Sequence, residues 1–364
     1  MHRRAFLGSA AATLVLPGCA TTMATRRPAA TPTGCLPRVL VSPDRVIRTV
    51  AGLRPYRAAG FVVRAEALGD KRLVHNYGHG GAGITLSWGT SKLAATLGLQ
   101  GHLGPVAVLG AGVMGLSTAR LVQEAGFPVT IYARALPPDT TSNIAGGQFH
   151  PFGHFRRSRV TPEWQTQFLA AVDYSWRRFQ IMVGDDYGIR WLPTYADRGT
   201  PEEQLLPTFP PHNRLLRTDE HPFPWPSVIS YDTMYVETGR YLRQMLRDVQ
   251  LARGTIRVRD FAMPADIAAL PERLVFNCTG LGSRALFDDQ ELQPARGQLA
   301  ILLPQPEIRY AFTGGDGYMF PRADGIILGG TFELDQWDTN PEPEVIARIL
   351  ASHQQLQARL RCTT

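Results

Sequence analysis

The sequence predicts an α/β protein with a Rossmann-like dinucleotide-binding domain and a second domain. The length of 364 residues favours about two domains. The hydrophobic fraction of 44% and the charged fraction of 19% are typical of a globular chain and exclude a disordered one. The strongest observation is the segment 104–126, GPVAVLGAGVMGLSTARLVQEAG, in which a short apolar run is followed by a glycine-rich turn and a helical pattern.

Each part of that segment has a physical reason. Val106–Leu109 is apolar throughout, as a buried parallel strand requires, and residues 116–125 have helical spacing. The glycines let the backbone turn tightly and approach a pyrophosphate, to which the start of the helix presents free N–H groups. Residues 127–133 (FPVTIYA) supply a second strand. We therefore predict dinucleotide contacts from Gly110, Gly112, Val113, Met114 and Gly115.

The residue after the second strand departs from the usual pattern. An acidic residue commonly holds the adenosine ribose at this position, but this chain has Arg134, followed by Ala135. We still place both residues at the adenosine end of the cofactor. The ribose must then be held from elsewhere or less tightly, and Arg134 either stacks on the adenine or faces solvent.

A second glycine-rich stretch stands before the dinucleotide loop. Residues 73–89 read LVHNYGHGGAGITLSWG, and four glycines fall within residues 78–83. Because so many glycines cost backbone entropy in a helix or strand, close approach to a ligand is the favoured interpretation and an ordinary flexible turn is the alternative. Residues 91–97 (SKLAATL) are predicted to form a short helix.

These two segments resemble the D-amino-acid oxidase family, as do residues 52–55 (GLRP), 138–151 (PDTTSNIAGGQFHP) and 317–321 (GYMFP). The resemblance implies a Rossmann-like FAD-binding domain and a substrate domain built on a mostly antiparallel sheet. In the family the dinucleotide loop opens the chain and the HNYGHGG segment closes it, whereas here the order is reversed. We therefore predict a circular permutation of the D-amino-acid oxidase fold.

The resemblance also implies which residues contact FAD. Small residues in two segments would let the flavin ring approach the backbone, and His150 and His154 nearby are interpreted as structural rather than as acid–base groups. Phe261 would meet the adenine, and Thr279 would lie near the diphosphate. The implied flavin contacts are Thr140, Thr141, Ser142, Asn143, Ile144, Ala145, Gly146 and Gly147, with Gly80, Gly81, Ala82, Gly83, Ile84 and Thr85.

Three residues are implied to act on the substrate. Arg54 would bind a carboxylate in a two-pronged salt bridge, because a planar guanidinium matches a carboxylate and stays charged when desolvated. Tyr318 would bind the same carboxylate, and the Gly81 carbonyl would accept a hydrogen from the substrate amino group. Many family members carry a second tyrosine four residues before the first, where this chain has Gly314, and Tyr310 is a candidate substitute.

Two further family-like motifs are interpreted as structural. Residues 296–298 (RGQ) are expected to form a turn into the substrate-domain sheet, and residues 328–331 (LGGT) are expected to be part of a strand. When residues 38–98 are read in their family position, Arg54 and Gly81 are predicted to meet Tyr318 around one flavin.

The function implied is FAD-dependent oxidation of a D-amino acid to the imino acid, with O2 reduced to hydrogen peroxide. The alternatives are a glycine- or sarcosine-type amine oxidase, a periplasmic amino-acid dehydrogenase with another electron acceptor, and a catalytically weak FAD-binding protein. The net charge of +7 comes from scattered arginines without a basic block among aromatics, so nucleic-acid binding is not expected. The cysteines and histidines have no metal-ligand spacing, so no metal site is expected.

The first residues, MHRRAFLGSAAATLVLPGCA, resemble an export signal. Arg3 and Arg4 precede a short apolar run, and this twin-arginine layout predicts export of the folded protein to the periplasm. Residues 16–19 (LPGC) resemble a lipobox, which would make Cys19 a membrane tether; plain cleavage or an uncleaved anchor is the alternative. Because the ends of a permuted chain should lie together, a Cys35–Cys362 disulfide is a further hypothesis.

The predicted organisation has five parts. They are an export signal (1–19), a flexible tether (20–37), a permuted segment with the substrate arginine and the glycine loop (38–98), the FAD-binding domain (99–160 and 245–295) and the substrate domain (161–244 and 296–364).

Overall fold

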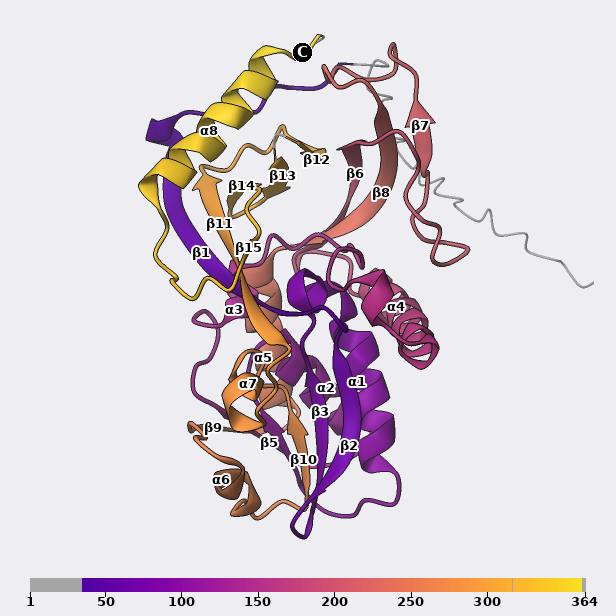
Figure 1. The fold of residues 1–364 in the computed structure, drawn as a ribbon, viewed down its shortest axis with the longest axis vertical. Helices are drawn as coiled ribbons and strands as arrows, with labels where there is room; N and C mark the ends of the chain where they lie inside the picture. The colour runs from indigo at the N-terminus through magenta and orange to yellow at the C-terminus, as the bar shows by residue number, and fades with distance from the viewer. Residues whose placement is uncertain (1–34, 316, 362–364) are drawn as a thin grey trace, which may run out of the picture.

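The computed structural model describes residues 35–315 and 317–361, which form two sheets placed one above the other in Figure 1. The lower sheet has six strands, parallel from β3 to β9, with β2 antiparallel at one edge. Its strands, in spatial order, are β2 (Val62–Leu68), β3 (Lys71–Tyr77), β10 (Leu274–Asn277), β4 (Val106–Leu109), β5 (Val129–Ala133) and β9 (Thr255–Val258). This is the parallel sheet that the dinucleotide motif requires.

Helices pack on both sides of this sheet. On one side α1 contacts α2 and α4, and α2 contacts α5. These helices are α1 (Gly83–Leu99), α2 (Val113–Glu124), α4 (Pro162–Ile181) and α5 (Thr238–Leu251). On the other side the short helices α6 (Pro264–Ala268) and α7 (Gly282–Leu286) contribute Ile267 and Leu286 to a core with Leu73, Leu109 and Val275 of the strands.

The upper sheet has nine strands and is antiparallel except where β12 pairs with β6. In spatial order they are β1 (Val46–Arg57), β11 (Leu292–Leu302), β14 (Gly325–Gly329), β13 (Gly317–Arg322), β12 (Ala311–Gly314), β6 (Ile189–Asp197), β8 (Val228–Val236) and β7 (Arg214–Leu216), and β15 (Glu333–Leu334) pairs with β11. Helix α8 (Pro343–Ala358) packs on one face through a large apolar core. The predicted α/β class, with one domain on a parallel sheet and another on a mostly antiparallel sheet, is confirmed.

Two local predictions were wrong in their bounds. The helix expected at residues 91–97 begins at Gly83, because its first half is buried against α2 and α4 and this packing outweighs the backbone entropy of its glycines. A Cβ on Gly89 would lie 1.9 Å from the Ala171 carbonyl oxygen, so this glycine is needed for the close approach of α1 and α4. The RGQ motif lies inside β11, paired with β1, and does not form a turn.

The two sheets divide the chain differently from the predicted domains in two places. Helix α4, expected in the substrate domain, packs against α1 on the six-stranded sheet, where Phe168, Ala171 and Val172 are buried. Helix α5 begins at Thr238, crosses the predicted domain boundary at residue 245 and packs against α2. Both helices are amphipathic, and the sequence pattern does not state which sheet receives their apolar face.

The two ends of the described chain lie together. The Val39 N–H donates a hydrogen bond of 2.9 Å to the side chain of Gln357, and Val39 is buried in the core beneath α8. The predicted export signal, most of the tether, Cys19 and Cys362 lie outside the described residues. In the part that is described, no helix combines the length and the apolar character that crossing a membrane requires.

The remaining elements are short. They are the 3-10 helices η1 (Pro43–Arg45), η2 (Gly80–Ala82) and η3 (Arg157–Arg159), and the one-turn helix α3 (Thr141–Ile144) that lies between the two sheets.

Candidate active site

The dinucleotide loop has the close backbone contacts that its glycines predict. Gly110 has a φ of +103°, and a Cβ there would lie 2.5 Å from the Cys278 carbonyl oxygen. A Cβ on Gly115 would lie 1.9 Å from the Gly110 carbonyl oxygen. Any larger residue at this position would therefore prevent α2 from packing so closely on the turn after β4. Gly112 precedes the first turn of α2, and the Val113 N–H donates to the Ser142 hydroxyl at 3.0 Å. Backbone N–H groups at a helix start are a favourable site for a phosphate.

Residues 140–147 run from this helix start to the nine-stranded sheet. The Thr140 hydroxyl donates to the Asn143 side chain at 2.8 Å, and the Ile144 side chain packs over Gly52 of β1. A Cβ on Gly146 would lie 2.9 Å from the Phe320 ring. The segment therefore connects the dinucleotide loop to the sheet that carries the predicted substrate residues.

The second glycine loop reaches the same place from the other side. Gly80–Ala82 form a 3-10 turn, and α1 begins at Gly83, where a Cβ would lie 3.9 Å from the Met114 methyl group of α2. The Thr85 hydroxyl accepts a hydrogen bond of 2.9 Å from the His150 N–H. The starts of α1 and α2 thus lie side by side, so the two predicted sets of flavin contacts converge.

The predicted adenosine end lies beyond the carboxyl ends of β5, β9 and β10. Arg134 is exposed just after β5, and Ala135 is half-buried. Phe261 is buried against Tyr132, with the Arg259 guanidinium 4.9 Å above its ring. The Thr279 hydroxyl donates to the Asn277 side chain at 2.8 Å, in the turn beside Gly110.

Arg54 lies on β1 with its guanidinium flat over Gly297 of β11. A Cβ on Gly297 would lie 2.3–2.5 Å from the guanidinium atoms, so only glycine fits beneath it. The guanidinium donates to the Thr331 carbonyl at 3.3 Å and lies 5.8 Å from the Phe332 ring centre. Among the described residues no carboxylate pairs with Arg54, so its charge is available to an acidic ligand.

Gly81 lies next to this arginine. A Cβ on Gly81 would be 3.5 Å from the Arg54 Cδ atom, in ordinary van der Waals contact. The glycine loop and the predicted carboxylate-binding residue are therefore neighbours.

Tyr318 lies on the same sheet face as Arg54. Residues directly opposite one another on antiparallel strands share a face, and so do alternate residues of one strand. Gly52 pairs with Gly297, Leu299 pairs with Gly329, and Gly329 pairs with Tyr318. The Tyr318 ring lies over Gly329, where a Cβ would be 2.3 Å from the ring. Residues 54, 81 and 318, distant in sequence, are thus brought to one region of the fold.

Tyr310 does not take the place of a second active-site tyrosine, so that prediction was wrong. Tyr310 is buried on the other face, beneath α8, and its hydroxyl donates to the Pro37 carbonyl at 2.9 Å. Gly314 also faces away, with Trp225 3.0 Å from where its Cβ would be. The residue opposite Tyr318 on the same face is Thr313. Counting four residues back from Tyr318, as in the family motif, leads to Gly314 instead.

The two histidines near the site differ in their surroundings. Burial lowers the pKa of His154 to about 3, and His154 is packed among Phe155, Trp164 and Phe168. His150 lies 3.8 Å from the buried carboxylate of Glu202. A histidine with so low a pKa, such as His154, stays neutral at physiological pH and is not available as an imidazolium acid.

The RGQ and LGGT motifs hold in place the segment of residues 331–342, which contacts Arg54 and which we call the strap. The buried Arg296 side chain forms ion pairs with Glu333 and Glu342. The Gln298 N–H donates to the Thr331 hydroxyl at 2.7 Å, and the Glu342 N–H donates to the Gln298 side chain at 2.8 Å. The sequence suggested only a structural role, but these contacts fix the strap whose Thr331 carbonyl holds Arg54.

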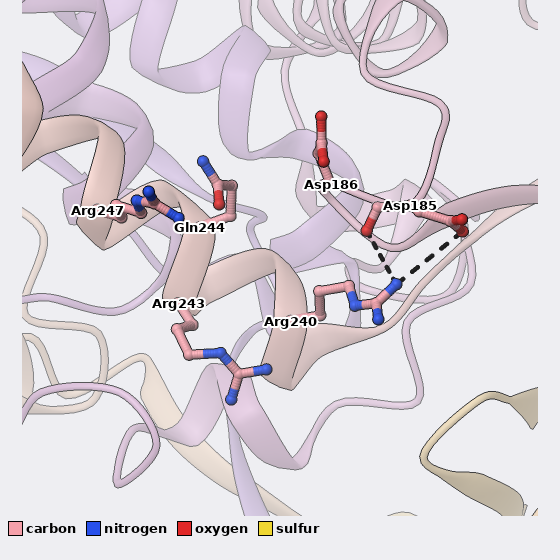
Figure 2. Close-up of a pocket in the computed structure, with 6 residues that line it drawn as sticks. All are labelled: Asp185, Asp186, Arg240, Arg243, Gln244 and Arg247. Atoms are coloured by element: carbon pink, nitrogen blue, oxygen red, sulfur yellow. Dashed lines mark hydrogen bonds and ion pairs between the residues drawn. The ribbon is translucent and has the colours of Figure 1, made fainter.

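Among the cavities of the described chain, one adjoins the predicted flavin contacts and another lies on α5. A small cavity of about 60 Å³ is lined by Asn143 and Ile144 together with Arg48, Val50, Pro138, Ile301, Arg322 and Ile327. A larger, open cavity of about 460 Å³ lies on α5, lined by Asp185, Asp186, Arg240, Arg243, Gln244 and Arg247 (Figure 2). No predicted site residue lines the larger cavity. Among the described residues no group of three or more His, Cys, Asp or Glu side chains is arranged to hold a metal ion.

Known proteins resemble this chain in sequence and in fold. A family model described as DAO, FAD dependent oxidoreductase, matches residues 32–97 and 105–361. The D-amino acid oxidase of Dugesia ryukyuensis is 30% identical over 261 residues, which is 67% of this chain and 75% of the relative. The D-amino-acid oxidase of Streptomyces coelicolor is 29% identical over 270 residues, 68% of this chain and 76% of the relative.

Solved structures share the fold at low identity. The glycine oxidase of Geobacillus kaustophilus has a TM-score of 0.52 at 14% identity, covering 71% of this chain and 80% of the other. The iminodiacetate oxidase of Chelativorans sp. BNC1 has a TM-score of 0.51 at 15% identity, covering 70% and 79%.

The fold and the site together define a flavin-dependent oxidoreductase. The chain belongs to the DAO family of FAD-dependent oxidoreductases, and FAD is its cofactor. The dinucleotide loop fits this cofactor, because Gly110 and Gly115 allow the tight turn and the start of α2 presents backbone N–H groups.

Proposed function

We propose that this protein oxidises a D-amino acid to the corresponding imino acid. The observation that carries the proposal is an arginine without an acidic partner in the described chain, Arg54, lying on the sheet face of Tyr318 and against Gly81. In such an arrangement the carboxylate of an amino acid would meet Arg54 and Tyr318, and its amine would meet the Gly81 carbonyl. The sequence relatives support this reading, because they are D-amino-acid oxidases.

The proposed reaction balances as a two-electron oxidation. FAD, when bound, accepts the hydride that leaves the substrate Cα. The amino group loses a proton as the C=N bond forms, and water then converts the imino acid to a keto acid and ammonia. We propose O2 as the final acceptor, which takes two electrons and two protons to become hydrogen peroxide.

The protein's own residues would supply orientation. The Arg54 guanidinium would pair with the substrate carboxylate through two hydrogen bonds, and the Tyr318 hydroxyl would donate a third. The Gly81 carbonyl would accept a hydrogen from the amine and turn the Cα hydrogen in one direction. Fixing the substrate in this way lowers the entropic part of the activation free energy. The proposed mechanism therefore uses no acid–base residue.

One screen tests this function. The purified FAD-loaded protein is mixed with D-amino acids, L-amino acids, glycine and sarcosine, while flavin absorbance and peroxide are followed. Flavin reduction by D-amino acids with release of peroxide is expected. Reduction only by glycine or sarcosine would instead indicate the amine-oxidase alternative, and reduction without peroxide would indicate a dehydrogenase. Failure of all substrates to reduce the flavin would leave a protein that binds FAD without turnover.

We also propose that the chain is circularly permuted relative to its family. The family model matches in two segments, and the interruption at residues 98–104 coincides with the short link between α1 and β4. The contact between Val39 and Gln357 supports a family order in which α8 leads directly into β1. A chain rebuilt to begin at residue 105, with residue 361 joined by a short linker to residue 36 and ending at residue 98, should bind FAD and keep its activity. Loss of folding in that chain, with several linker lengths, would argue against the permutation.

Export to an oxidising compartment is a further proposal, and Cys35 supports it. Cys35 is disulfide-bonded. The neighbouring backbone lies beside the end of α8, where Arg38 donates to the Leu360 carbonyl, so we propose Cys362 as the partner. The export signal and lipid-modified Cys19 remain proposals, which mass spectrometry of the mature N-terminus tests directly.

Removal of this disulfide is expected to lower stability rather than activity. Closing a loop of nearly the whole chain restricts the unfolded state and contributes about 2–4 kcal/mol. The Cys35→Ser variant should therefore unfold at a lower denaturant concentration, with an unchanged flavin spectrum. Non-reducing peptide mapping should identify the Cys35–Cys362 peptide, and a free thiol at Cys35 would contradict the prediction.

The strap held by Arg296 provides a further prediction. In the Arg296→Met variant, Glu333 and Glu342 lose their cation and the Thr331 carbonyl is less well placed against Arg54. We expect KM for the amino acid to rise about tenfold, equivalent to about 1.4 kcal/mol, with kcat and FAD content within about twofold. Arg296→Lys should recover part of this loss. The exposed Arg64→Met serves as the control, and an equal change in both variants would contradict the role of the strap.

A further inference from the structure

Helix α5 and the edge strand β9 carry a concentrated positive charge. Residues 238–260 contain six arginines and two aspartates, a net charge of +4 in a chain whose total is +7. Arg243 and Arg247 are four residues apart and so lie in one row of α5, and Leu251 continues that row. Arg253 follows in the turn, and Arg257 lies on β9 at the edge of the sheet. We call these five residues, with Val258, the arginine face.

The arginines of this face have no side-chain partner in the part of the chain that the structure describes. Among the described residues no ion pair or side-chain hydrogen bond engages Arg243, Arg247, Arg253 or Arg257. Arg240, one turn earlier, donates to the Asp185 carbonyl at 2.9 Å. Figure 2 shows Arg240 directed toward Asp185 and Arg243 directed away from it, on an open cavity of about 460 Å³. Four guanidinium groups are therefore available to phosphate oxygens.

Exposed apolar side chains lie among these charges. Leu251 is 71% exposed and Val258 is 73% exposed, while the opposite side of α5 is buried through Tyr241, Leu242 and Met245. A mixture of arginines and exposed aliphatic side chains matches a bilayer interface, where the guanidinium groups meet headgroup phosphates and the aliphatic groups enter the acyl boundary. Nucleic acid would favour exposed aromatics for stacking, and Phe261, the nearest aromatic after β9, is buried. A second copy of the chain would bring like charges together.

We propose that the arginine face binds the surface of a membrane rich in anionic phospholipids. Each arginine near such a surface contributes a few-fold to the partition of the protein onto it, and the contribution falls as salt shortens the Debye length. No residue of the arginine face is among the predicted substrate or flavin contacts, so substrate turnover in solution is not expected to depend on it. The proposal is also independent of the oxidase reaction, because membrane binding requires no turnover.

Vesicle sedimentation tests this proposal with the FAD-loaded full chain carrying Cys19→Ser, which removes any lipid anchor. The protein is mixed with phosphatidylcholine vesicles, with or without about 30% phosphatidylglycerol. We expect binding only to the anionic vesicles and release in about 0.5 M salt, where the Debye length is about 4 Å. The double variant Arg243→Gln with Arg247→Gln should bind at least about tenfold less and keep the flavin spectrum of the parent.

The matched control removes the same charge from another surface. Arg348 and Arg359 are exposed on α8 and at its end, and the double variant Arg348→Gln with Arg359→Gln should bind as the parent does. Equal losses in the two double variants would overturn the proposal, because net charge alone would then explain binding. Equal binding to neutral and anionic vesicles would also overturn it. A single-stranded oligonucleotide that competes with the vesicles at equal phosphate concentration would overturn it in favour of nucleic acid.

Discussion

We expect the Arg54→Gln variant to lose about 10²- to 10³-fold in kcat/KM for an amino acid while keeping its FAD. A carboxylate that loses its bidentate cation in a desolvated site costs about 3–4 kcal/mol, and each 1.4 kcal/mol is a factor of ten. Glutamine keeps a donor for the Thr331 carbonyl, so the strap should remain in place. Steady-state kinetics and the flavin absorbance of the same preparation measure the two effects separately.

The control for Arg54 is Arg64→Gln on β2. Arg64 is an exposed arginine in a surface pair with Glu66, and such pairs contribute little. Its kcat/KM should match that of the parent. If Arg54→Gln keeps full activity toward every substrate that the parent oxidises, the carboxylate is bound elsewhere and the substrate-site proposal is wrong.

The second large effect is expected from Gly115→Ala. The added Cβ would lie 1.9 Å from the Gly110 carbonyl oxygen, a backbone atom that cannot rotate away. Helix α2 would have to move from β4, and the backbone N–H groups at its start would no longer match a diphosphate. We expect FAD affinity to fall by more than about 100-fold and the free energy of unfolding by about 2–4 kcal/mol.

Gly239→Ala is the matched control for this substitution. Gly239 lies in the first turn of α5, and no atom lies within 4 Å of where its Cβ would be. Alanine there should stabilise the protein slightly, by up to about 1 kcal/mol, with normal FAD content. Flavin absorbance per protein and denaturant unfolding measure both variants, and normal FAD binding by Gly115→Ala would refute the predicted loop geometry.

The sequence predicted the strand, the glycine turn and the helix of the dinucleotide motif correctly, because this geometry is local. The strand Val106–Leu109, the turn at Gly110 and the start of α2 are consecutive, so each glycine has a neighbour that explains it. The second strand, predicted at residues 127–133, likewise forms as β5 (Val129–Ala133). Local elements of this kind depend on backbone sterics and hydrophobic periodicity, which a single sequence displays.

The surroundings of Arg54 could not be predicted in the same way. The motif GLRP indicated the residue. However, Gly297 beneath its guanidinium lies on β11, and the Thr331 carbonyl beside it lies between β14 and β15, both more than 240 residues away in the chain. The RGQ motif was expected to be a turn because its partner strand is distant in sequence. Its role in holding the strap is visible only from the pairing of β11 with β1 and with β15.

The sequence by itself determined the α/β class, the dinucleotide loop and the unusual order of the motifs, because these follow from composition, local backbone geometry and position along the chain. Only the tertiary structure decided which residues share a face with Tyr318. Successive residues of a strand face opposite sides of the sheet, and a shift of one residue exchanges Thr313 for Gly314 at the site. Strand register is set by packing against distant strands, so it cannot be predicted from the amino-acid pattern of one strand.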